Sequence, residues 1–301
     1  MWQSEALRII ASLLSIGLNG AQLIGKCRAK LVAKFFWNGK KTRRLRVEPS
    51  PLPEAWKETP QAGTRLTFEI EGVEFAFRYC PAGEFTMGSP ASEAGRRDVE
   101  ALRKVTLTRG FWLLETPVTQ GEYKAVTGKN PSFFRAGDDF PVETVSWADC
   151  QDYLEALNAL EIAPENFAFR LPTEAEWEYA CRAGTTGPYN LDRPLDWLGW
   201  YRGNSEKKTR KVRGKNANAW GLYDMRGNVW EWTADWYAST YPDGDAVDPA
   251  GPNAGSSRVL RGGYWGTSAA RCRSACRNDN YPDARRAGYG FRFALTLRPN
   301  G

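Results

Sequence analysis

Turn-forming residues are the feature that most constrains the fold of this chain. From about residue 185 onward, Gly, Pro, Asn and Asp recur between short aromatic segments. Upstream, residues 66–79 (LTFEIEGVEFAFRY) alternate between apolar and polar side chains on either side of Gly72. This pattern predicts two paired strands joined by a glycine turn. Short strands separated by long loops favour a largely antiparallel α+β domain.

Two segments have the spacing of amphipathic helices. Residues 145–160 start beside Ser146, a good N-cap, and place their apolar side chains on one face. Residues 171–184 carry Glu176 at the capping-box position and end at Gly184. We therefore expect two helices in the main domain.

The second of these segments is rich in glutamate. Glu174 and Glu178 lie one helical turn apart, a spacing that suggests a pair of hydrolytic carboxylates. Helix capping and a solvated helix face are the simpler interpretation, and we expect no hydrolytic site there.

The first 50 residues differ in charge from the rest of the chain. They contain ten Lys or Arg against two Glu, a net charge of +8, so the remainder carries −2 of the total of +6. We predict that residues 1–48 form a basic helical extension, with a helical hairpin from Ser4 to about Phe36. Residues 49–65 are predicted to form a proline-rich linker, and residues 66–298 the main domain.

The basic extension suggests three roles. Its helices could pack on a partner, lie on an acidic membrane surface, or dock on the chain's own domain. The apolar stretch Ile9–Gly25 is too interrupted for a spanning helix or a convincing secretion signal. A cytoplasmic location, with peripheral membrane association as an option, is the default expectation. The near-neutral charge of the main domain predicts no nucleic-acid partner.

The chain contains no histidine. This absence excludes Ser-His and Cys-His nucleophile pairs, imidazole-bound zinc and histidine general bases. A metal ion would need carboxylate, carbonyl or thiolate ligands. The six cysteines are scattered without C-x-x-C spacing, so we expect reduced, mostly buried thiols and no disulfide framework.

Six segments occur in an order that is found in one known family. They are PAGEFTMGS, ETPVTQGEYKAVTGKNPS, PVETVSWADCQDYLEALN, FRLPTEAEWEYACRAGTT, NAWGLYDMRGNVWEWTADWY and the closing RVLRGGYW…CRSACRN…PD…GYGFRFA. Through them, residues 70–295 resemble the formylglycine-generating enzyme (sulfatase-modifying factor) superfamily. The resemblance implies a C-type-lectin-like fold with a twisted antiparallel sheet, two helices and long ordered loops. This fold hosts oxidases, iron enzymes and pure binders, so function must be argued from the sites.

The resemblance implies one catalytic arrangement that can be checked in the sequence. Family members that make formylglycine use a copper(I) ion on two cysteines, with four residues between them, shortly after an RGG motif. Soft thiolates select copper(I). Counting forward from Gly263 places this pair on Thr267 and Cys272, and counting back from the later Pro-Asp places its second member on Ala269. Either way the first thiolate is missing, so we expect no catalytic residue.

A copper-dependent alternative remains. Cys272 and Cys276 stand one residue too close for the family spacing. A substitute copper site on these two cysteines would make the chain an oxidase that acts on a cysteine of a protein substrate.

The segment GLYDMRGNVWEW carries a candidate cation site. Asp224 and Glu231 bracket a tight turn that can bring both carboxylates and the carbonyls of Gly227 and Val229 towards one point. Such hard oxygen ligands suit calcium, and the resemblance implies a structural calcium ion at these four positions. The alternative is that the two acids cap the turn or pair with nearby arginines. A second calcium site of the family would fall in residues 204–216, which are basic, so we expect it to be lost.

The closing segment interleaves two kinds of position. The framework positions, which follow the family, are Arg261, Gly262, Gly263, Trp265, Arg273, Ser274, Arg277, Asn278, Pro282, Asp283, Gly290, Phe291 and Arg292. The pattern resembles the variable proteins of diversity-generating retroelements, whose C-terminal segment is diversified by adenine-directed mutagenesis. The residue types between the framework positions are compatible with such diversification of an asparagine codon.

We therefore predict a non-catalytic recognition surface on the closing segment, for an unknown protein or small ligand. Tyr and Arg supply large contact areas, and small polar residues adapt to the ligand. Ordinary exposed loop residues are the alternative. The predicted ligand-binding residues are Tyr264, Trp265, Gly266, Thr267, Ser268, Ala269, Arg271, Cys276, Asp279, Tyr281, Ala284, Arg286, Ala287 and Tyr289.

Overall fold

The computed structural model describes residues 32–35, 43–48, 59–164, 166–189 and 193–298, and the chain divides into two units after Glu48. In the first unit, β1 (Val32–Phe35) pairs antiparallel with β2 (Arg43–Glu48). The predicted helical hairpin was therefore wrong for its last residues, where β-branched and aromatic side chains favour a strand. Its earlier part lies outside the described residues, as do residues 49–58 of the linker.

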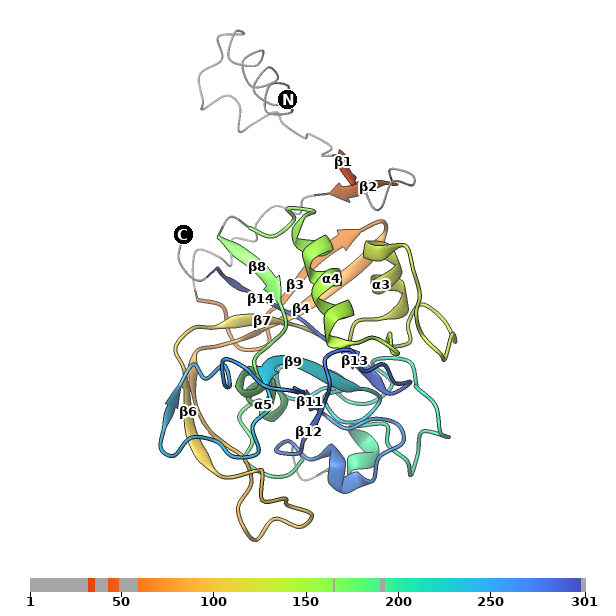
Figure 1. Ribbon diagram of the computed structural model, residues 1–301. Helices are drawn as coiled ribbons and strands as arrows, with labels where there is room; N and C mark the ends of the chain where they lie inside the picture. The colour runs from red at the N-terminus through yellow and green to blue at the C-terminus, as the bar shows by residue number, and fades with distance from the viewer. Residues whose placement is uncertain (1–31, 36–42, 49–58, 165, 190–192, 299–301) are drawn as a thin grey trace. The chain divides into compact units, whose positions relative to one another are not determined.

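An antiparallel sheet forms one half of the second unit (Figure 1). Its strands in spatial order are β3 (Arg65–Ile70), β4 (Val73–Cys80), β7 (Phe111–Leu114), β14 (Ala294–Leu297) and β8 (Phe167–Arg170). The first two strands form the predicted hairpin, in which Ile70 lies opposite Val73. Glu71 and Gly72 both have positive φ, 52° and 78°, as a two-residue hairpin turn requires.

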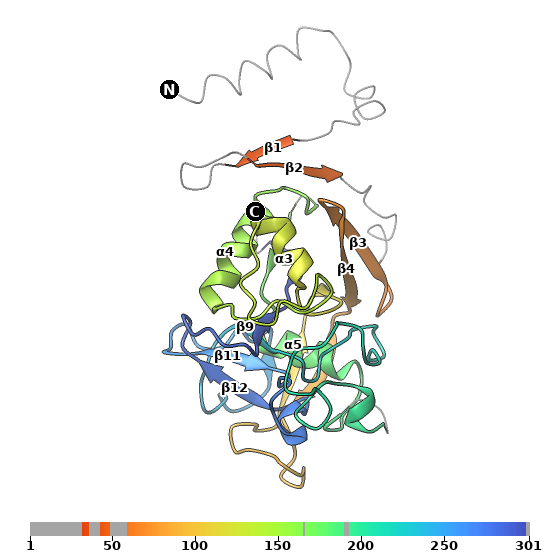
Figure 2. The same ribbon diagram turned by 90° about the vertical axis from the view of Figure 1, so that its right-hand side faces the viewer.

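Two helices, α3 (Gln120–Thr127) and α4 (Trp147–Asn158), lie on one side of this sheet (Figure 2). The helix α4 and its N-cap Ser146 are confirmed. The helix α3 was not predicted, although Thr119 and Glu122 form a capping box at its start and Gly128 caps its end in the left-handed region. The described residues therefore contain three α-helices, one more than the sequence predicted.

Aromatic side chains fill the space between the sheet and these helices. Phe77, Phe169 and Phe293 are all buried, and their ring centroids lie 5.5–6.0 Å apart. Tyr153 of α4 joins them at 5.9 Å from Phe293. Such clusters stabilise beyond their buried area because the rings pack at tilted or edge-to-face angles.

Two smaller sheets form the other half of the second unit. One has the order β10 (Ala246–Val247), β6 (Arg103–Leu107), β5 (Gly83–Met87). The other has the order β12 (Arg277–Asn280), β11 (Arg258–Arg261), β9 (Trp230–Trp236), β13 (Tyr289–Phe291). Strand pairing is antiparallel except for β10 with β6 and β13 with β9, so the largely antiparallel α+β prediction is confirmed.

The helix α5 (Glu174–Arg182) contacts β5, β9 and β11, and all nine of its residues are buried. Thr173 and Glu176 form the predicted capping box. The predicted solvated face was wrong, because Glu174 and Glu178 are 3% and 0% exposed and pair with arginines. Among the described residues, no helix is both long and apolar enough to cross a membrane.

Candidate ligand-binding site

The closing segment is fixed in the fold by buried arginines. Arg273 donates to both carboxylate oxygens of Glu100, at 2.7 and 2.8 Å, and Arg277 donates to both oxygens of Glu174, at 2.6 and 2.9 Å. Each arginine is at most 1% exposed and lies more than 100 residues along the chain from its partner. These bidentate pairs hold the segment in one geometry.

Two further framework arginines are equally buried. Arg261 contacts the Glu178 carboxylate and donates to the Ser274 carbonyl at 2.7 Å. Arg292 donates to both oxygens of Glu231, at 2.7 and 2.8 Å. These framework positions of the closing segment therefore face inward, and the fold depends on them.

A pocket of about 490 Å³ opens on this segment. Its volume lies in the range of small-ligand sites, roughly 300–1,000 Å³. The residues that line it are Trp230, Tyr264, Trp265, Thr267, Arg271, Asn278, Arg286, Ala287, Gly288 and Tyr289. Seven of these belong to the fourteen predicted ligand-binding residues, so half of the predicted set lies around one concavity.

The Tyr264 ring forms part of the pocket wall and is held closely. A methyl group built on Gly288 would lie 2.3 Å from a ring carbon of Tyr264, and one built on Gly266 would lie 2.8 Å from the ring. The Thr267 hydroxyl bonds with the backbone of Tyr264. Trp265 donates from its indole nitrogen to the Ala287 carbonyl at 2.8 Å. The aromatic wall is therefore preorganised.

Two cationic side chains complete the wall. Arg271 and Arg286 line the pocket, and neither side chain has an ion pair or hydrogen bond to any residue the structure describes. Asn278 of β12 adds an amide. No residue that lines this pocket is acidic. The site therefore combines aromatic faces with unpaired positive charge.

The other seven predicted residues do not line the pocket. They are Gly266, Ser268, Ala269, Cys276, Asp279, Tyr281 and Ala284. Gly266 supports the Tyr264 ring, Ala269 packs in an apolar cluster, and Cys276 is fully buried. Tyr281 is 65% exposed, outside the pocket.

Asp279 lies on the far face of β12. Alternate side chains of a strand point to opposite faces, so Asp279 shares the face of Arg277, which stacks over the Tyr237 ring at 4.8 Å. Asn278, which the sequence placed in the framework, faces the pocket instead. Trp230 and Gly288 also line the pocket, although the sequence pattern did not predict them as ligand-binding residues. The strand alternation within RNDN was the signal that could have found Asn278.

The cysteines lie in apolar surroundings. Cys272 is fully buried with Leu195 and Leu198, and burial raises the pKa of its thiol to about 12. The Thr267 hydroxyl oxygen lies 3.7 Å from the Cys272 sulfur, where counting from Gly263 places the first copper ligand. Burial also raises the pKa of Cys276. Thiolates are the metal-binding form of cysteine, and this site disfavours them.

The acidic turn is buried. Glu231 accepts from Arg292 and from the Trp177 indole nitrogen at 2.7 Å, so it has the arginine partner that the sequence left as an alternative. Among the described residues, Asp224 accepts from the Arg213 backbone and the Asn228 amide, at 2.8 and 3.2 Å. Burial raises the pKa of Asp224 to about 6.

This donor set fits a hard cation in part. Asp224 is a buried carboxylate whose hydrogen-bond donors among the described residues are neutral, and the carbonyls of Gly227 and Val229, a few residues further along the chain, are oxygen ligands of the kind that calcium takes. Glu231 would have to share its oxygens with the Arg292 guanidinium. Calcium at this turn stays a prediction.

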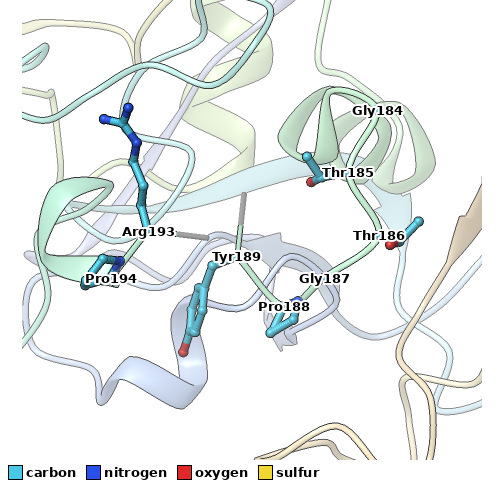
Figure 3. Close-up of a pocket in the computed structure, with 8 residues that line it drawn as sticks. All are labelled: Gly184, Thr185, Thr186, Gly187, Pro188, Tyr189, Arg193 and Pro194. Atoms are coloured by element: carbon cyan, nitrogen blue, oxygen red, sulfur yellow. The ribbon is translucent and has the colours of Figure 1, made fainter. Parts of the chain in front are cut away.

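A larger hollow of about 1,030 Å³ lies between Gly184 and Pro194 (Figure 3). Residues 190–192, within this stretch of the sequence, are outside the described part of the chain, so no site is assigned to the hollow. The Tyr189 ring lies beside η3 (Ala269–Cys272), and its hydroxyl donates to the Ala269 carbonyl at 3.0 Å. Tyr189 thereby covers the Cys272 cluster from this side.

Comparison with known proteins identifies relatives over most of the second unit. Residues 76–297 match the sulfatase-modifying factor enzyme 1-like domain. The formylglycine-generating enzyme of Streptomyces coelicolor is 36% identical over 173 residues, 51% of this chain and 52% of the relative. The inactive C-alpha-formylglycine-generating enzyme 2 of Bos taurus is 33% identical over 256 residues, 79% of this chain and 72% of the relative.

A similar solved structure is that of Treponema denticola variable protein 1. It is 31% identical, covers 80% of this chain and 100% of its own, and superposes with a TM-score of 0.72. The chain spans about half the length of the formylglycine-generating enzymes it matches.

Proposed function

This chain belongs to the sulfatase-modifying factor enzyme 1-like domain family and has its C-type-lectin-like fold, and from that premise we propose that it is a recognition protein without catalytic activity. The pocket around Tyr264 and Arg286 holds a ligand and does not transform it. The ligand is a protein or a small molecule.

The observation that carries this proposal is that the closing segment contains two kinds of arginine, one buried in the fold and one lining the pocket. Framework arginines such as Arg273 and Arg277 are buried and paired, so they supply the fold. Arg271 and Arg286 line a concave surface and have no side-chain partner in the part of the chain that the structure describes. A rigid scaffold with exchangeable contact residues is the physical basis of antibody-like recognition. The likeness to a variable protein supports diversification of these positions.

The surroundings of the cysteines support the proposal that the chain has no copper-dependent catalytic activity. A copper(I) ion needs soft ligands, and the chain offers buried Cys272 with a hydroxyl beside it. The test is oxygen consumption by the full chain with copper and a cysteine-bearing peptide. We expect no copper-dependent turnover, and mass spectrometry should recover the peptide thiol unchanged. Turnover that disappears in Cys272→Ser would overturn the proposal.

Diversification has its own test. A reverse transcriptase gene near the coding sequence, together with a near-duplicate of the DNA for residues 260–292, would support it. The duplicate should differ at codons of pocket residues and agree at codons of the framework arginines. Absence of both would leave a recognition protein that is not diversified.

A copper-dependent oxidase remains the second candidate. The observation in its favour is that a charge on Cys276 contributes to raising the pKa of Cys272, after burial, because this interaction is expected only of thiols that lie near each other. Curated relatives named as formylglycine-generating enzymes also favour it. In this case Cys272 and Cys276 would share the metal. Loss of activity in Cys276→Ser as well as in Cys272→Ser is its signature.

Two further proposals concern calcium and the basic extension. Calcium bound at Asp224 would stabilise the fold, so added calcium should raise the melting temperature and Asp224→Asn should abolish that rise. Deleting residues 1–48 should remove binding to acidic liposomes if the extension acts as a membrane contact. Retained liposome binding would assign the contact to the main domain.

A further inference from the structure

Two arginines that line the pocket have no ion pair or side-chain hydrogen bond among the described residues, unlike their neighbour in sequence. Arg285 forms a bidentate pair with Asp149, at 2.7 and 2.8 Å. Its neighbour Arg286 lines the pocket and pairs with no described residue, and the same holds for Arg271. Guanidinium groups bind carboxylates through two parallel hydrogen bonds. The pocket therefore offers two sites for an anionic group.

Among the described residues, no carboxylate lines the pocket and competes for these guanidinium groups. The ten residues that line it include no Asp or Glu. Asp279, the nearest acid in sequence to the wall residue Asn278, lies on the opposite face of β12. The electrostatic complement of the pocket must come from the ligand.

A row of aromatic rings leads out of the pocket. Tyr264 meets Trp265 at a centroid distance of 5.1 Å, Trp265 meets Phe134 at 5.5 Å, and Phe134 meets Phe133 at 5.0 Å. All three contacts are edge-to-face. Phe133 is 73% exposed at the end of the row.

The loop that carries Phe133 is joined to the pocket rim. Within this connection between α3 and α4, the Thr144 amide donates to the Arg286 carbonyl at 3.0 Å. Figure 2 shows the same connection running beside the second half of the unit. The exposed ring and the unpaired cations therefore belong to one continuous surface, although they come from segments about 150 residues apart.

We propose that the partner is a protein segment with an acidic side chain that enters the pocket between Arg271 and Arg286, and an apolar side chain that covers Phe133. This inference rests on the proposed recognition function and names its ligand class. A small molecule that fills the pocket does not reach the end of the ring row. An extended peptide advances about 3.3 Å per residue, so about five residues are enough to span three ring-to-ring steps.

The experiment is a selection from a phage-displayed library of random peptides on the immobilised full chain. The selected sequences should share an Asp or Glu with an apolar residue a few positions away. The consensus peptide, and a version with its acid changed to the amide, are then titrated by fluorescence anisotropy. We expect Arg271→Gln and Arg286→Gln each to weaken binding about tenfold or more, because each removes a charge-assisted hydrogen bond.

Arg285→Gln is the matched control, since it removes the same charge from the neighbouring position. It should leave affinity within about twofold, as expected for an exposed charge outside the site. The amide peptide should bind weakly to the wild type and lose nothing further in Arg286→Gln. Phe133→Ala should weaken binding while the preference for the acidic peptide persists. Equal losses in Arg285→Gln and Arg286→Gln would overturn the inference.

The other outcomes separate this inference from the function on which it rests. Selected peptides that lack an acid, yet lose binding in Tyr264→Ala, overturn the acidic ligand class and leave recognition in place. A library that yields no pocket-dependent peptide overturns the peptide partner. Copper-dependent oxidation of a cysteine peptide overturns recognition itself.

Discussion

Gly288→Ala tests whether the Tyr264 ring is fixed in the pocket wall by its neighbours. The added methyl would lie 2.3 Å from Tyr264 Cδ2 and 2.9 Å from Cγ and Cε2. Carbon atoms pack best at about 3.5–4.0 Å, so the ring must move by more than about 1 Å. Gly266 contacts the same ring, which limits how the ring can retreat.

The expected cost follows from this overlap. Overpacking of this kind costs about 1–3 kcal/mol. Gly288 does not have a positive φ, so backbone strain adds nothing to the cost. For a domain of about 250 residues, the melting temperature should fall by roughly 2–4 °C for each kcal/mol, or about 2–12 °C in all. Binding at the pocket should weaken in parallel because the wall is displaced.

Thermal unfolding of four variants tests this prediction: Gly288→Ala, Gly187→Ala, Tyr264→Ala and the double variant Tyr264→Ala/Gly288→Ala. Gly187→Ala is the control, because the nearest atom to its added methyl is the Tyr189 carbonyl oxygen at 3.4 Å. It should melt within about 1 °C of the wild type. Adding Tyr264→Ala to Gly288→Ala removes the overlap, so the two substitutions should couple by at least about 0.5 kcal/mol. Wild-type melting of Gly288→Ala, or simple additivity in the double variant, would refute the steric argument.

Four other substitutions or labels test separate parts of the structure. Burial, aided by the Glu174 and Glu176 charges, raises the pKa of Asp235 to about 8, so the folded chain keeps a proton that the unfolded chain releases above about pH 4. The melting temperature of the wild type should therefore fall as pH rises from about 4 to 8. Asp235→Asn keeps an oxygen acceptor for the backbone amide of Glu174, and its melting temperature should fall less over the same range. Identical pH profiles of the two melting temperatures would contradict this. Arg273→Met leaves the fully buried Glu100 without its cation and should cost about 3–5 kcal/mol in urea unfolding, against about 0–1 kcal/mol for Arg285→Gln. Cys272, buried and with its pKa raised to about 12, should react with iodoacetamide at pH 8 far more slowly in the folded chain than in urea, as read by peptide mass spectrometry, and equal rates would show an open thiol. Thr267→Cys places a second sulfur beside Cys272 and should increase copper(I) binding in competition with a chromophoric chelator. Binding equal to that of the wild type would show that position 267 does not correspond to the first copper ligand of the family.

Local signals in the sequence were sufficient for the hairpin and two of the helices. The Glu71-Gly72 turn sets the register of β3 with β4, and the capping boxes at Ser146 and Thr173 fix where α4 and α5 begin. The helix α3 has the same kind of cap at Thr119 but spans only eight residues. Two turns give too few apolar repeats for a helical period to be recognised.

The ion pairs between residues far apart in the sequence could not be predicted from the sequence. Glu174 and Glu178 have the spacing of a solvated helix face, yet their partners Arg277 and Arg261 lie 103 and 83 residues further along the chain. Only the packed fold brings these charges together.

The pocket was predicted in part, and strand geometry explains the remainder. Family framework spacing identified Tyr264, Arg271 and Arg286 as outward-facing, and they line the pocket. In β12 the assignment failed at two positions: Asn278 faces the pocket and Asp279 faces away from it. Alternation from the inward framework residue Arg277 indicates that direction, and pairing with β11, in which Leu260 lies opposite Asn278, fixes it.

The long-range anchoring of the framework arginines has a consequence for how this protein can change. Arg273 and Arg277 hold the closing segment through carboxylates elsewhere in the chain, whereas the side chains of Arg271, Arg286 and Ala287 form no ion pair or hydrogen bond with a described residue. A randomised library at these three positions should therefore retain the wild-type fold in nearly every member. New specificities can arise there by single substitutions, without compensating changes in the core.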